Sequence, residues 1–378
     1  MSNQDITPPQ VITCRAVVCW GPDQPLKLEE ITVDPPKASE VRVKLLYASV
    51  CHSDLLGSRG KPVQVFPRIL GHEGVGEVES LGSEVTGFKI GDVVVPVYIG
   101  ECGSCSNCKK DKTNLCLVNP LSLNGLLRDG TSRMSAQGKP LFHFLSCSTW
   151  SEYTVIDASY LVRVDSAVEP RHASFLSCGF STGYGAAWKE AHIEPGSTVA
   201  VLGLGAVGLG VIKGSSILGA TTIIGVDLNE AKRGKGEAFG MTHFLNPNQS
   251  EKSITELIQE MTGGMGVDYC FECTGVTGLV SQAVDSTKPG GGMAVIIGAG
   301  DENELHINFM SLIMGRTIKG TIFGGIKPRS DLPVLFDKCE RKEIQLDQLA
   351  SHEISLEELP NVEEILKEAD CVKISIKF

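Results

Sequence analysis

The chain has 378 residues, of which 42% are hydrophobic and 21% are charged, with a formal net charge of −11 at pH 7. This length exceeds what one hydrophobic core usually organises, so two domains are expected. The acidic balance argues against a nucleic-acid partner, because that binding depends on clustered lysine and arginine. Residues 1–11 resemble neither a signal peptide nor a transit helix, and the longest apolar stretch, 199–212, is interrupted by four glycines. These features predict a soluble cytoplasmic protein without a membrane partner.

The first hundred residues alternate apolar and polar positions in short runs separated by Gly, Pro and Asp turns. Runs of this kind predict β-strands, because successive side chains of a strand point to opposite faces. We expect strands at 41–46, 74–81 and 92–97. This half of the chain is therefore predicted to be mainly β.

From Ser197 the pattern changes to strand, glycine turn and helix, with helices expected at 206–218 and over an amphipathic stretch that runs to Phe239. Alternation of strands and helices predicts a parallel sheet with crossover helices. The strands are expected at 198–202, 222–226, 267–272, 293–297 and 317–322. A helical segment at 333–342 and a last strand at 372–376 differ from this series, and we interpret them as a return to the first domain.

The strongest chemical signal is a group of four cysteines in a loop rich in Gly, Ser, Asn and Lys: Cys102, Cys105, Cys108 and Cys116. In a chain without an export signal, cysteines indicate metal binding or catalysis before disulfides, since the cytosol keeps thiols reduced. Four thiolates close a tetrahedron around Zn(II) and leave no open position, which is typical of a structural site. Four unrelated thiols and an iron–sulfur cluster are the alternatives, and zinc is favoured over both.

A second group of potential ligands is dispersed along the chain and comprises Cys51, His72, Glu73 and Cys178. Two thiolates and one imidazole leave a fourth position on zinc for water or substrate, as a catalytic site requires. Each of these residues alone is weak evidence, because a lone cysteine is commonly a small buried hydrophobe. The hypothesis of a catalytic zinc depends on the set.

A glycine motif, Gly203, Gly205 and Gly208, follows the expected strand at 198–202 and opens a helix, and Asp227 lies at the end of the next strand. The glycines permit a tight turn and close approach of a dinucleotide pyrophosphate to the helix N-terminus, and the aspartate can accept hydrogen bonds from the adenosine ribose. An acidic residue there repels a 2′-phosphate. NAD is therefore favoured over NADP, although Lys232 is close enough to soften that preference.

These three groups occur in the order found in the zinc-containing medium-chain alcohol dehydrogenases, and the resemblance covers nearly the whole chain, including segments 129–133, 178–185 and 322–325. The sequence is similar to the long eukaryotic, plant-like form. The resemblance implies an α/β protein in which residues 1–179 form a GroES-like, β-rich catalytic domain with both zinc sites. Residues 180–322 would form a Rossmann NAD-binding domain with a doubly wound parallel sheet, and residues 323–378 would return to the catalytic domain. Members of this form are homodimers that pair through the Rossmann sheets.

The resemblance also implies roles for single residues. By matched position, Cys51, His72 and Cys178 hold the catalytic zinc, Glu73 is an alternate ligand, and Asp54 orients His72. The other matched positions concern the substrate and the cofactor: Ser53 bonds the substrate oxygen, His52 and Lys373 reach the pyrophosphate, and Lys232 contacts the ribose.

The implied reaction passes a hydride between NAD and an alcohol or aldehyde, with zinc lowering the pKa of the alcohol oxygen and Ser53 taking its proton. In well-known members the proton leaves through a histidine five positions after the first zinc cysteine. That position is Leu56 in this chain, and leucine cannot carry a proton. The sequence therefore predicts slower alcohol oxidation near neutral pH, with His52 as an alternative carrier.

The matched pocket positions are mostly apolar and suit a hydrophobic or allylic alcohol, such as a terpenoid or a biosynthetic aldehyde; they are Tyr98, Leu121, Phe144 and Leu145. Glutathione-dependent formaldehyde dehydrogenase is the competing enzyme type, but its anion-binding arginine aligns with Pro120. A zinc-free quinone or enoyl reductase would lack both cysteine sets. A non-catalytic scaffold would lose zinc ligands, and none is lost.

Overall fold

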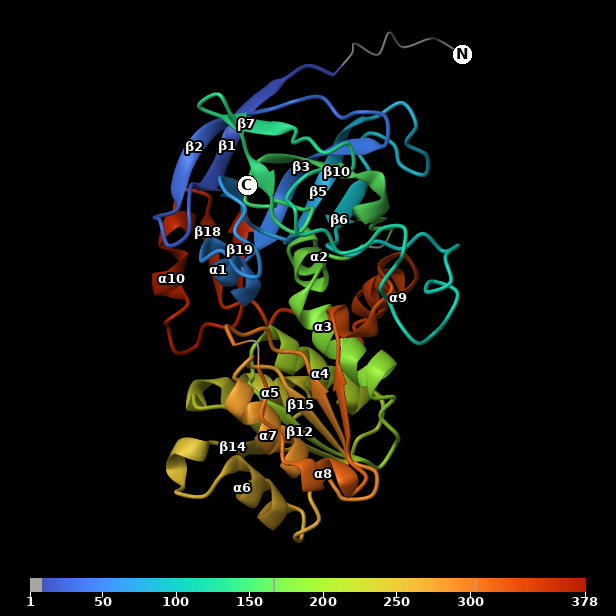
Figure 1. Cartoon of the computed structure of the whole chain (residues 1–378), viewed down its shortest axis with the longest axis vertical. Coiled ribbons are helices and arrows are strands. Elements are labelled where there is room, and N and C mark those ends of the chain that lie inside the picture. Colours follow the sequence, from blue (N-terminus) through green and yellow to red (C-terminus); the bar gives the residue numbers. More distant parts are fainter. Residues whose placement is uncertain (1–8, 166, 303) are drawn as a thin grey trace. The chain divides into compact units, whose positions relative to one another are not determined.

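The structure is a computed structural model that describes residues 9–165, 167–302 and 304–378 (Figure 1). The chain forms two compact units. The first unit comprises the chain up to Ser174 together with Glu353–Val362 and Ser375–Phe378. The second unit comprises Phe175–His352 and Glu363–Ile374. These limits differ from the predicted domain boundaries at 179/180 and 322/323. Compact packing does not by itself define a functional domain, so the predicted boundaries stay a prediction.

The strands of the first half of the chain and two strands near the C-terminus form two β-sheets. The strand orders are β8-β7-β2-β1-β4-β9 and β11-β6-β5-β3-β19-β18, and β10 also pairs with β3. The strands are β1 (Ile12–Cys19), β2 (Lys27–Val33), β3 (Glu40–Ser49), β4 (Arg68–Ile69), β5 (Glu73–Leu81), β6 (Val93–Pro96), β7 (Met134–Ala136), β8 (Lys139–Pro140), β9 (Phe142–His143), β10 (Tyr153–Asp157), β11 (Leu161–Arg163), β18 (His352–Ser355) and β19 (Ile374–Lys377). The expected strands 41–46, 74–81 and 92–97 are therefore present as β3, β5 and β6. The C-terminal strand joins this part of the fold, because Ser375 pairs with Ser49 of β3.

The second unit contains a six-stranded sheet of order β14-β13-β12-β15-β16-β17 in which all neighbours are parallel. Its strands are β12 (Thr198–Leu202), β13 (Thr222–Val226), β14 (His243–Leu245), β15 (Tyr269–Glu272), β16 (Met293–Ile296) and β17 (Thr317–Gly320). Renumbered within this unit, the order reads 3-2-1-4-5-6, which is the strand order of the doubly wound dinucleotide-binding fold. The predicted fold class is confirmed, since one part is rich in β-strands and the other is a parallel α/β sheet.

The helices are α1 (His52–Ser58), α2 (Pro170–Leu176), α3 (Gly179–Gly185), α4 (Ala206–Ile217), α5 (Arg233–Phe239), α6 (Ile254–Met261), α7 (Thr277–Asp285), α8 (Phe309–Ile313), α9 (Pro328–Glu340) and α10 (Val362–Ile365). Helices cover both faces of the parallel sheet. Alternate residues of a strand face opposite sides of the sheet. Ala200 and Leu202 of β12 therefore face the same side, where they share a buried cluster with Ile258 of α6. A Cβ on Gly208 of α4 would instead lie 3.3 Å from the Val201 side chain, on the opposite face.

Helix α9 begins five residues earlier than the predicted segment 333–342. Pro328 occupies the first turn, where a missing backbone N–H costs nothing, and Asp331 accepts a hydrogen bond from the Lys327 N–H at 2.8 Å. Pro333 therefore lies inside the helix instead of starting it. The prediction was wrong because both prolines carry the same start signal, and only the Asp331 contact distinguishes them.

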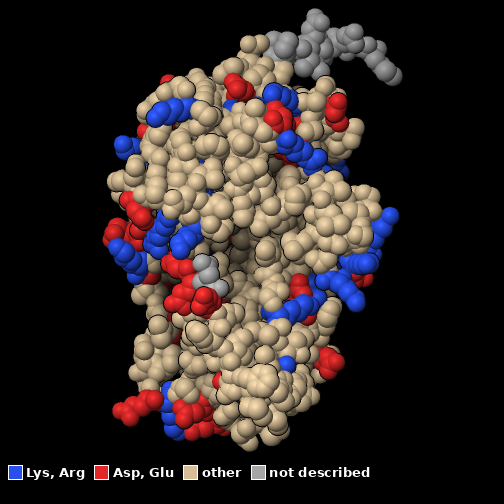
Figure 2. Space-filling view, in the orientation of Figure 1, with Lys and Arg blue, Asp and Glu red and all other residues tan. Residues whose placement is uncertain are grey.

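No helix among the described residues is both long and apolar enough to cross a membrane. On the face of the molecule shown in Figure 2, lysine and arginine side chains lie among uncharged surface and close to aspartate and glutamate side chains. That face carries no continuous basic surface, in keeping with the acidic net charge of the sequence.

Candidate active site and metal centres

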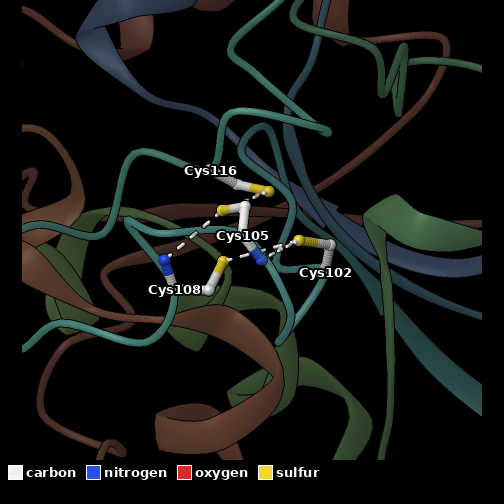
Figure 3. A group of neighbouring side chains, drawn as sticks. All are labelled: Cys102, Cys105, Cys108 and Cys116. Carbon is white, nitrogen blue, oxygen red and sulfur yellow. Dashed lines mark hydrogen bonds between the residues drawn. The ribbon is translucent and has the colours of Figure 1, made fainter.

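The four loop cysteines lie together and point toward one another (Figure 3). The Sγ atoms of Cys102 and Cys108 are 3.9 Å apart, and those of Cys105 and Cys116 are 4.0 Å apart. All four are free thiols. Zn–S bonds of about 2.3 Å arranged as a tetrahedron place the sulfurs about 3.8 Å apart, whereas a disulfide would bring two of them to about 2.05 Å. The sulfur spacing therefore fits a shared metal ion.

Backbone amides of the same loop donate to these sulfurs. The N–H of Cys105 lies 3.3 Å from the sulfur of Cys102, and the N–H of Asn119 lies 3.2 Å from that of Cys116. Hydrogen bonds from the Ser104 hydroxyl and the Ser104 and Cys105 amides lower the pKa of Cys102 to about 5. Donors around a sulfur favour the thiolate, which is the form that binds metal. The hydrogen bonds thus favour the thiolate at Cys102 and Cys105, whereas burial raises the pKa of Cys108.

A second potential metal centre is built on β3, α1 and β5. Cys51 is the residue before α1, and His72 directly precedes β5, which begins with Glu73. Potential ligand atoms of these three residues lie within 4.8 Å of one another. β3 and β5 pair antiparallel, with Ser49 opposite Glu73, and this register brings the two loops together.

Asp54 fixes the orientation of His72. Its Oδ1 atom lies 2.8 Å from Nδ1 of His72, and its two carboxylate oxygens also accept the N–H groups of Gly71 and Cys51 at 3.2 and 2.9 Å. Burial opposes the charged imidazole, but Asp54 and Cys51 outweigh it and raise the pKa of His72 well above its ordinary value. An imidazole that donates Nδ1–H to a carboxylate presents Nε2 as a metal ligand.

Two of the predicted pocket residues pack around this histidine. The ring of Tyr98 meets that of His72 edge-on with centroids 5.5 Å apart, and Phe144 does so at 5.8 Å. Both aromatic residues are buried, whereas Leu121 and Leu145 are partly exposed. Tyr98 and Phe144 therefore give His72 apolar neighbours. Electrostatic interactions of the imidazole are stronger in such surroundings than in water.

The other predicted residues of this group differ in exposure. Ser53 is partly buried in the first turn of α1, and His52 beside it is exposed. Glu73 is fully buried, and its carboxylate accepts a hydrogen bond from the Ser49 hydroxyl. Cys178 belongs to the second unit, where it is a buried thiol at the residue before α3.

The glycine motif forms the turn between β12 and α4. Gly203 has a φ of +93°, a conformation that L side chains rarely adopt, and a Cβ on Gly208 would lie 1.9 Å from the Gly203 carbonyl oxygen. A Cβ on Gly205 would meet no atom of the described chain within 4 Å. Two glycines are thus required by the turn itself, and the third leaves space over the N-terminus of α4 that a pyrophosphate can fill.

Asp227 directly follows β13 and reaches back to this turn. Its Oδ2 atom accepts the Leu204 N–H at 2.9 Å and lies 3.2 Å from Nζ of Lys232, and its Oδ1 atom accepts the Asn229 N–H at 2.9 Å. The carboxylate is therefore held beside the glycine turn with a cation next to it. Lys373 is buried in the last segment of the second unit, where Ser351 bonds its backbone.

Comparison with known proteins identifies the family. Residues 37–166 match the alcohol dehydrogenase GroES-like domain, and residues 206–341 match the zinc-binding dehydrogenase domain. The chain is 56% identical over 373 residues to alcohol dehydrogenase 1 of Artemisia annua, which covers 98% of this chain and 99% of the relative. It is also 56% identical over 373 residues to the CYP enzymes assisting alcohol dehydrogenase of Catharanthus roseus, covering 97% of this chain and 99% of that one.

The chain belongs to the zinc-dependent medium-chain alcohol dehydrogenase family. Solved members of similar fold include an alcohol dehydrogenase zinc-binding domain protein of Burkholderia ambifaria, with a TM-score of 0.89, 29% identity and coverage of 98% of this chain and 100% of that one. The benzyl alcohol dehydrogenase of Acinetobacter calcoaceticus has a TM-score of 0.87 and 26% identity, covering 97% and 99%. As a family member this protein is an NAD-dependent, zinc-containing oxidoreductase that interconverts alcohols with aldehydes or ketones.

The sequence did not indicate Thr182 as a candidate site residue. The hydroxyl of Thr182 in α3 is buried without a hydrogen-bond partner among the described residues. A buried hydroxyl without a partner is costly, so it marks a position where a bound molecule would supply the partner. A single threonine in a glycine-rich helix gives no such signal in the sequence.

Proposed function

We propose that this alcohol dehydrogenase holds two zinc ions per chain, one structural and one catalytic, and acts on hydrophobic or allylic alcohols and their aldehydes. The observation that carries the proposal is the pair of donor sets: four thiols at tetrahedral spacing, and a separate set of Cys51, His72 and Glu73 in which Asp54 already orients the imidazole. Structural zinc takes four protein ligands, whereas catalytic zinc takes three and keeps one position open.

The catalytic set needs one more thiolate, and we assign it to Cys178. Cys51, His72 and Cys178 would then hold the metal, and the buried Glu73 would stand behind it as an alternate ligand. When bound, Zn(II) supplies Lewis acidity that lowers the pKa of an alcohol oxygen, and NAD⁺ supplies the hydride acceptor. Asp54 would keep the Nδ1 proton on His72 and so preserve Nε2 as the ligand atom.

Two neighbours of Cys51 would handle the substrate and the cofactor. Ser53 would accept the proton of the substrate hydroxyl through its Oγ atom, and the exposed His52 would contact the cofactor pyrophosphate. Leu56 lies buried in α1 and offers no proton acceptor on this path. Asp54 of the same turn is committed to His72 and to two backbone N–H groups, so a proton leaving Ser53 would have to pass through His52 or through water.

Asp227 would select NAD over NADP. Its carboxylate is fixed by two backbone N–H groups at the end of β13, where the adenosine ribose of a dinucleotide bound over Gly205 would lie. A 2′-phosphate at that place would meet a fixed negative charge. Lys232, 3.2 Å from Asp227, would contact the ribose and moderate the repulsion, and Lys373 would reach the pyrophosphate.

The substrate class follows from the apolar lining. Tyr98 and Phe144 would form the wall beside His72, and Leu121 and Leu145 would extend it. Such a lining favours an apolar body next to the reacting carbon and leaves the identity of the substrate open. The aromatic substrate named for the Acinetobacter relative is of this class. Glutathione-dependent formaldehyde oxidation is disfavoured by Pro120 at the arginine position.

We also propose that the enzyme is a homodimer in the cytoplasm. Helix α8 and Met314, the residue after it, carry four apolar side chains that are each more than half exposed: Phe309, Met310, Ile313 and Met314. They adjoin β17, the last strand of the parallel sheet, which pairs only with β16 among the described strands. An exposed apolar patch beside an open sheet edge suits pairing with a second copy. Thirteen free cysteines suit a reducing compartment.

The experiment that tests the proposed function is zinc content by mass spectrometry, together with NADH absorbance over a panel of short, cinnamyl and terpenoid alcohols and aldehydes. We expect about two zinc ions per chain and the highest kcat/KM on the hydrophobic substrates. Cys51→Ser should lose one zinc and at least 10³-fold in activity, whereas Cys339→Ser, a thiol of α9, should keep both. One zinc per native chain without turnover would refute the catalytic assignment.

A further inference from the structure

A cavity of about 270 Å³ lies within the first unit, between the loop that follows Cys116 and the turn after β9. Six of its lining residues are polar, namely Ser122, Asn124, Arg128, Ser146, Asp157 and Tyr160, and the apolar ones include Leu126 and Leu127. A lining that combines aliphatic and polar side chains can hold a small molecule with an apolar body.

Two exposed polar side chains of the lining, Arg128 and Asn124, each keep a hydrogen-bond donor that no described residue accepts. Arg128 uses Nε on Asp157 at 3.0 Å and Nη2 on the Ser159 hydroxyl at 2.8 Å, and its Nη1 has no hydrogen-bond partner among the described residues. Asn124 accepts the Leu126 N–H at 3.0 Å through Oδ1, which fixes the amide orientation. Its Nδ2 group likewise has no partner in the described part of the chain. A ligand here would have to supply acceptors.

The acceptors of this wall are already in use. The Oδ1 atom of Asp157 accepts the Ser159 N–H at 2.9 Å, and its Oδ2 atom accepts the Ser39 hydroxyl at 3.0 Å in addition to Arg128. The Tyr160 hydroxyl donates to the Pro120 carbonyl at 2.7 Å. Arg128 and Asn124 each keep one donor group, and the Asp157 carboxylate is already paired. Two such donors match a planar group with two acceptor oxygens.

The backbone at the cavity adds a second, independent observation. Leu145 and Ser146 have φ values of +50° and +61°, a left-handed conformation that side chains other than glycine rarely adopt. Such conformations cost free energy and concentrate where a loop must present particular groups to a ligand. Ser146 lines the cavity together with Asn124 and Arg128.

We propose that this cavity is a second small-molecule site, for a carboxylate attached to an apolar body, and that it is distinct from the proposed catalytic centre. The carboxylate binds Nη1 of Arg128 and Nδ2 of Asn124, and the apolar body lies against Leu126 and Leu127. The loops that line the cavity also carry two of the proposed pocket residues. Leu121 lies in sequence between the lining residues Pro120 and Ser122, and Leu145 directly precedes the lining residue Ser146. The site therefore lies directly behind two of the proposed pocket residues.

The test is calorimetric titration of the zinc-loaded protein with trans-cinnamate. Asn124→Asp is the informative variant, because it keeps the Oδ1 acceptor for Leu126 and replaces the Nδ2 donor with a negatively charged oxygen. We expect binding of one cinnamate per chain, at least 10-fold weaker in Asn124→Asp and in Arg128→Gln. Arg163→Gln serves as the control, since that arginine pairs with Asp165 away from the cavity and its loss should leave binding unchanged.

The same titration is repeated on Cys51→Ser to separate this site from the proposed catalytic zinc. Unchanged cinnamate binding in Cys51→Ser supports the cavity. Loss of binding there, or equal affinity in native protein and Asn124→Asp, would place the carboxylate at the zinc and overturn the proposal while leaving the proposed function intact. Absence of cinnamate binding to the native protein at millimolar concentration would also overturn it.

Discussion

His72 and His143 are both buried histidines, and their surroundings give them opposite properties. Asp54 lies 2.8 Å from Nδ1 of His72, and although burial opposes the charged imidazole, Asp54 and Cys51 raise its pKa well above the ordinary value. Neither ring nitrogen of His143 has a hydrogen-bond partner among the described residues, and burial, followed by the charge of Arg133, lowers its pKa to about 4. The pKa of a buried histidine thus depends on what faces its ring nitrogens.

The lowered pKa of His143 predicts a pH-dependent stability. The unfolded chain protonates this histidine below about pH 6.5, whereas the folded protein resists protonation down to about pH 4. The stabilisation is therefore present above pH 6.5 and is lost as the pH falls toward 4, by about 2 kcal/mol between pH 7.5 and 5. Urea unfolding at these two pH values should show that the free energy of unfolding of His143→Leu falls less than that of the native protein, by this amount. His243→Leu, an exposed control, should behave like the native protein.

Leu56 is expected to limit the rate at which the proton leaves. It is buried in α1, at the position that the resemblance noted in the sequence analysis assigns to a proton-carrying histidine. We expect Leu56→His to raise kcat for alcohol oxidation at pH 7 by about tenfold, because a positioned base assists proton transfer. Small amine buffers should accelerate the native enzyme and have less effect on the variant. If stopped-flow and steady-state rates respond to neither change, proton release does not limit turnover.

At the scale of elements, close contacts between backbones explain much of the glycine content. A Cβ on Gly183 of α3 would lie 1.8 Å from the Val207 carbonyl oxygen, and one on Gly210 of α4 would lie 2.2 Å from that of Phe180. α3 and α4 therefore approach at distances that only glycine allows. These glycines serve packing, whereas Gly205 borders open space at the end of α4.

This difference gives a matched pair of substitutions. Gly205→Ala should fold normally, because its Cβ meets no described atom, and should raise the KM for NAD about tenfold by occupying the pyrophosphate space. Gly208→Ala places a Cβ 1.9 Å from the Gly203 carbonyl oxygen and should destabilise the protein by about 2 kcal/mol. Thermal melts and NAD titrations separate the two effects. A loss of stability in Gly205→Ala equal to that in Gly208→Ala would contradict this assignment.

The cysteine loop should depend on its metal for order. It contains no helix or strand from residue 101 to 118 and exposes three large aliphatic side chains, Leu115, Leu117 and Val118. We expect Cys105→Ser to reduce the zinc content by one ion per chain and the Tm by about 10 °C, because metal binding contributes directly to folding. Ser106→Ala in the same loop should change neither. Retention of two zinc ions in Cys105→Ser would show that the cluster is not the structural site.

At the scale of the whole molecule, the proposed metal ligands and cofactor-binding residues are divided between the two compact units. Cys51, His72 and the four loop cysteines lie in the first unit, and the glycine turn lies in the second. The reaction needs both a polarised alcohol oxygen and a held nicotinamide. The family membership of both segments accounts for their presence in one chain.

The apolar patch on α8 predicts the assembly state. The native protein should sediment at twice its chain mass of 40.4 kDa. The double substitution Phe309→Glu, Ile313→Glu should sediment as a single chain, because each of the two chains would bring two negative charges into the interface. Leu228→Glu, at another exposed apolar residue of the second unit, is the control and should remain dimeric. A dimer that survives the double substitution would place the interface elsewhere.

The sequence by itself determined most of the architecture and the metal chemistry. Strands β12 and β13 were predicted with their observed bounds, because a buried parallel strand is a short apolar run between glycine turns and needs no distant information. Cysteine spacing was equally informative, since four ligands within fifteen residues belong to one loop whatever the fold. The start of α9 was missed, because two prolines offered the same signal.

Only the tertiary structure decided which dispersed residues meet. Asp54 and His72 are eighteen residues apart, and the pairing of β3 with β5 brings the carboxylate to Nδ1. The Thr182 hydroxyl, which has no partner among the described residues, and the donors around the cavity at Arg128 also depend on packing between segments far apart in the chain. Local patterns fix local structure, whereas the partners of a side chain are set by packing over long sequence separations.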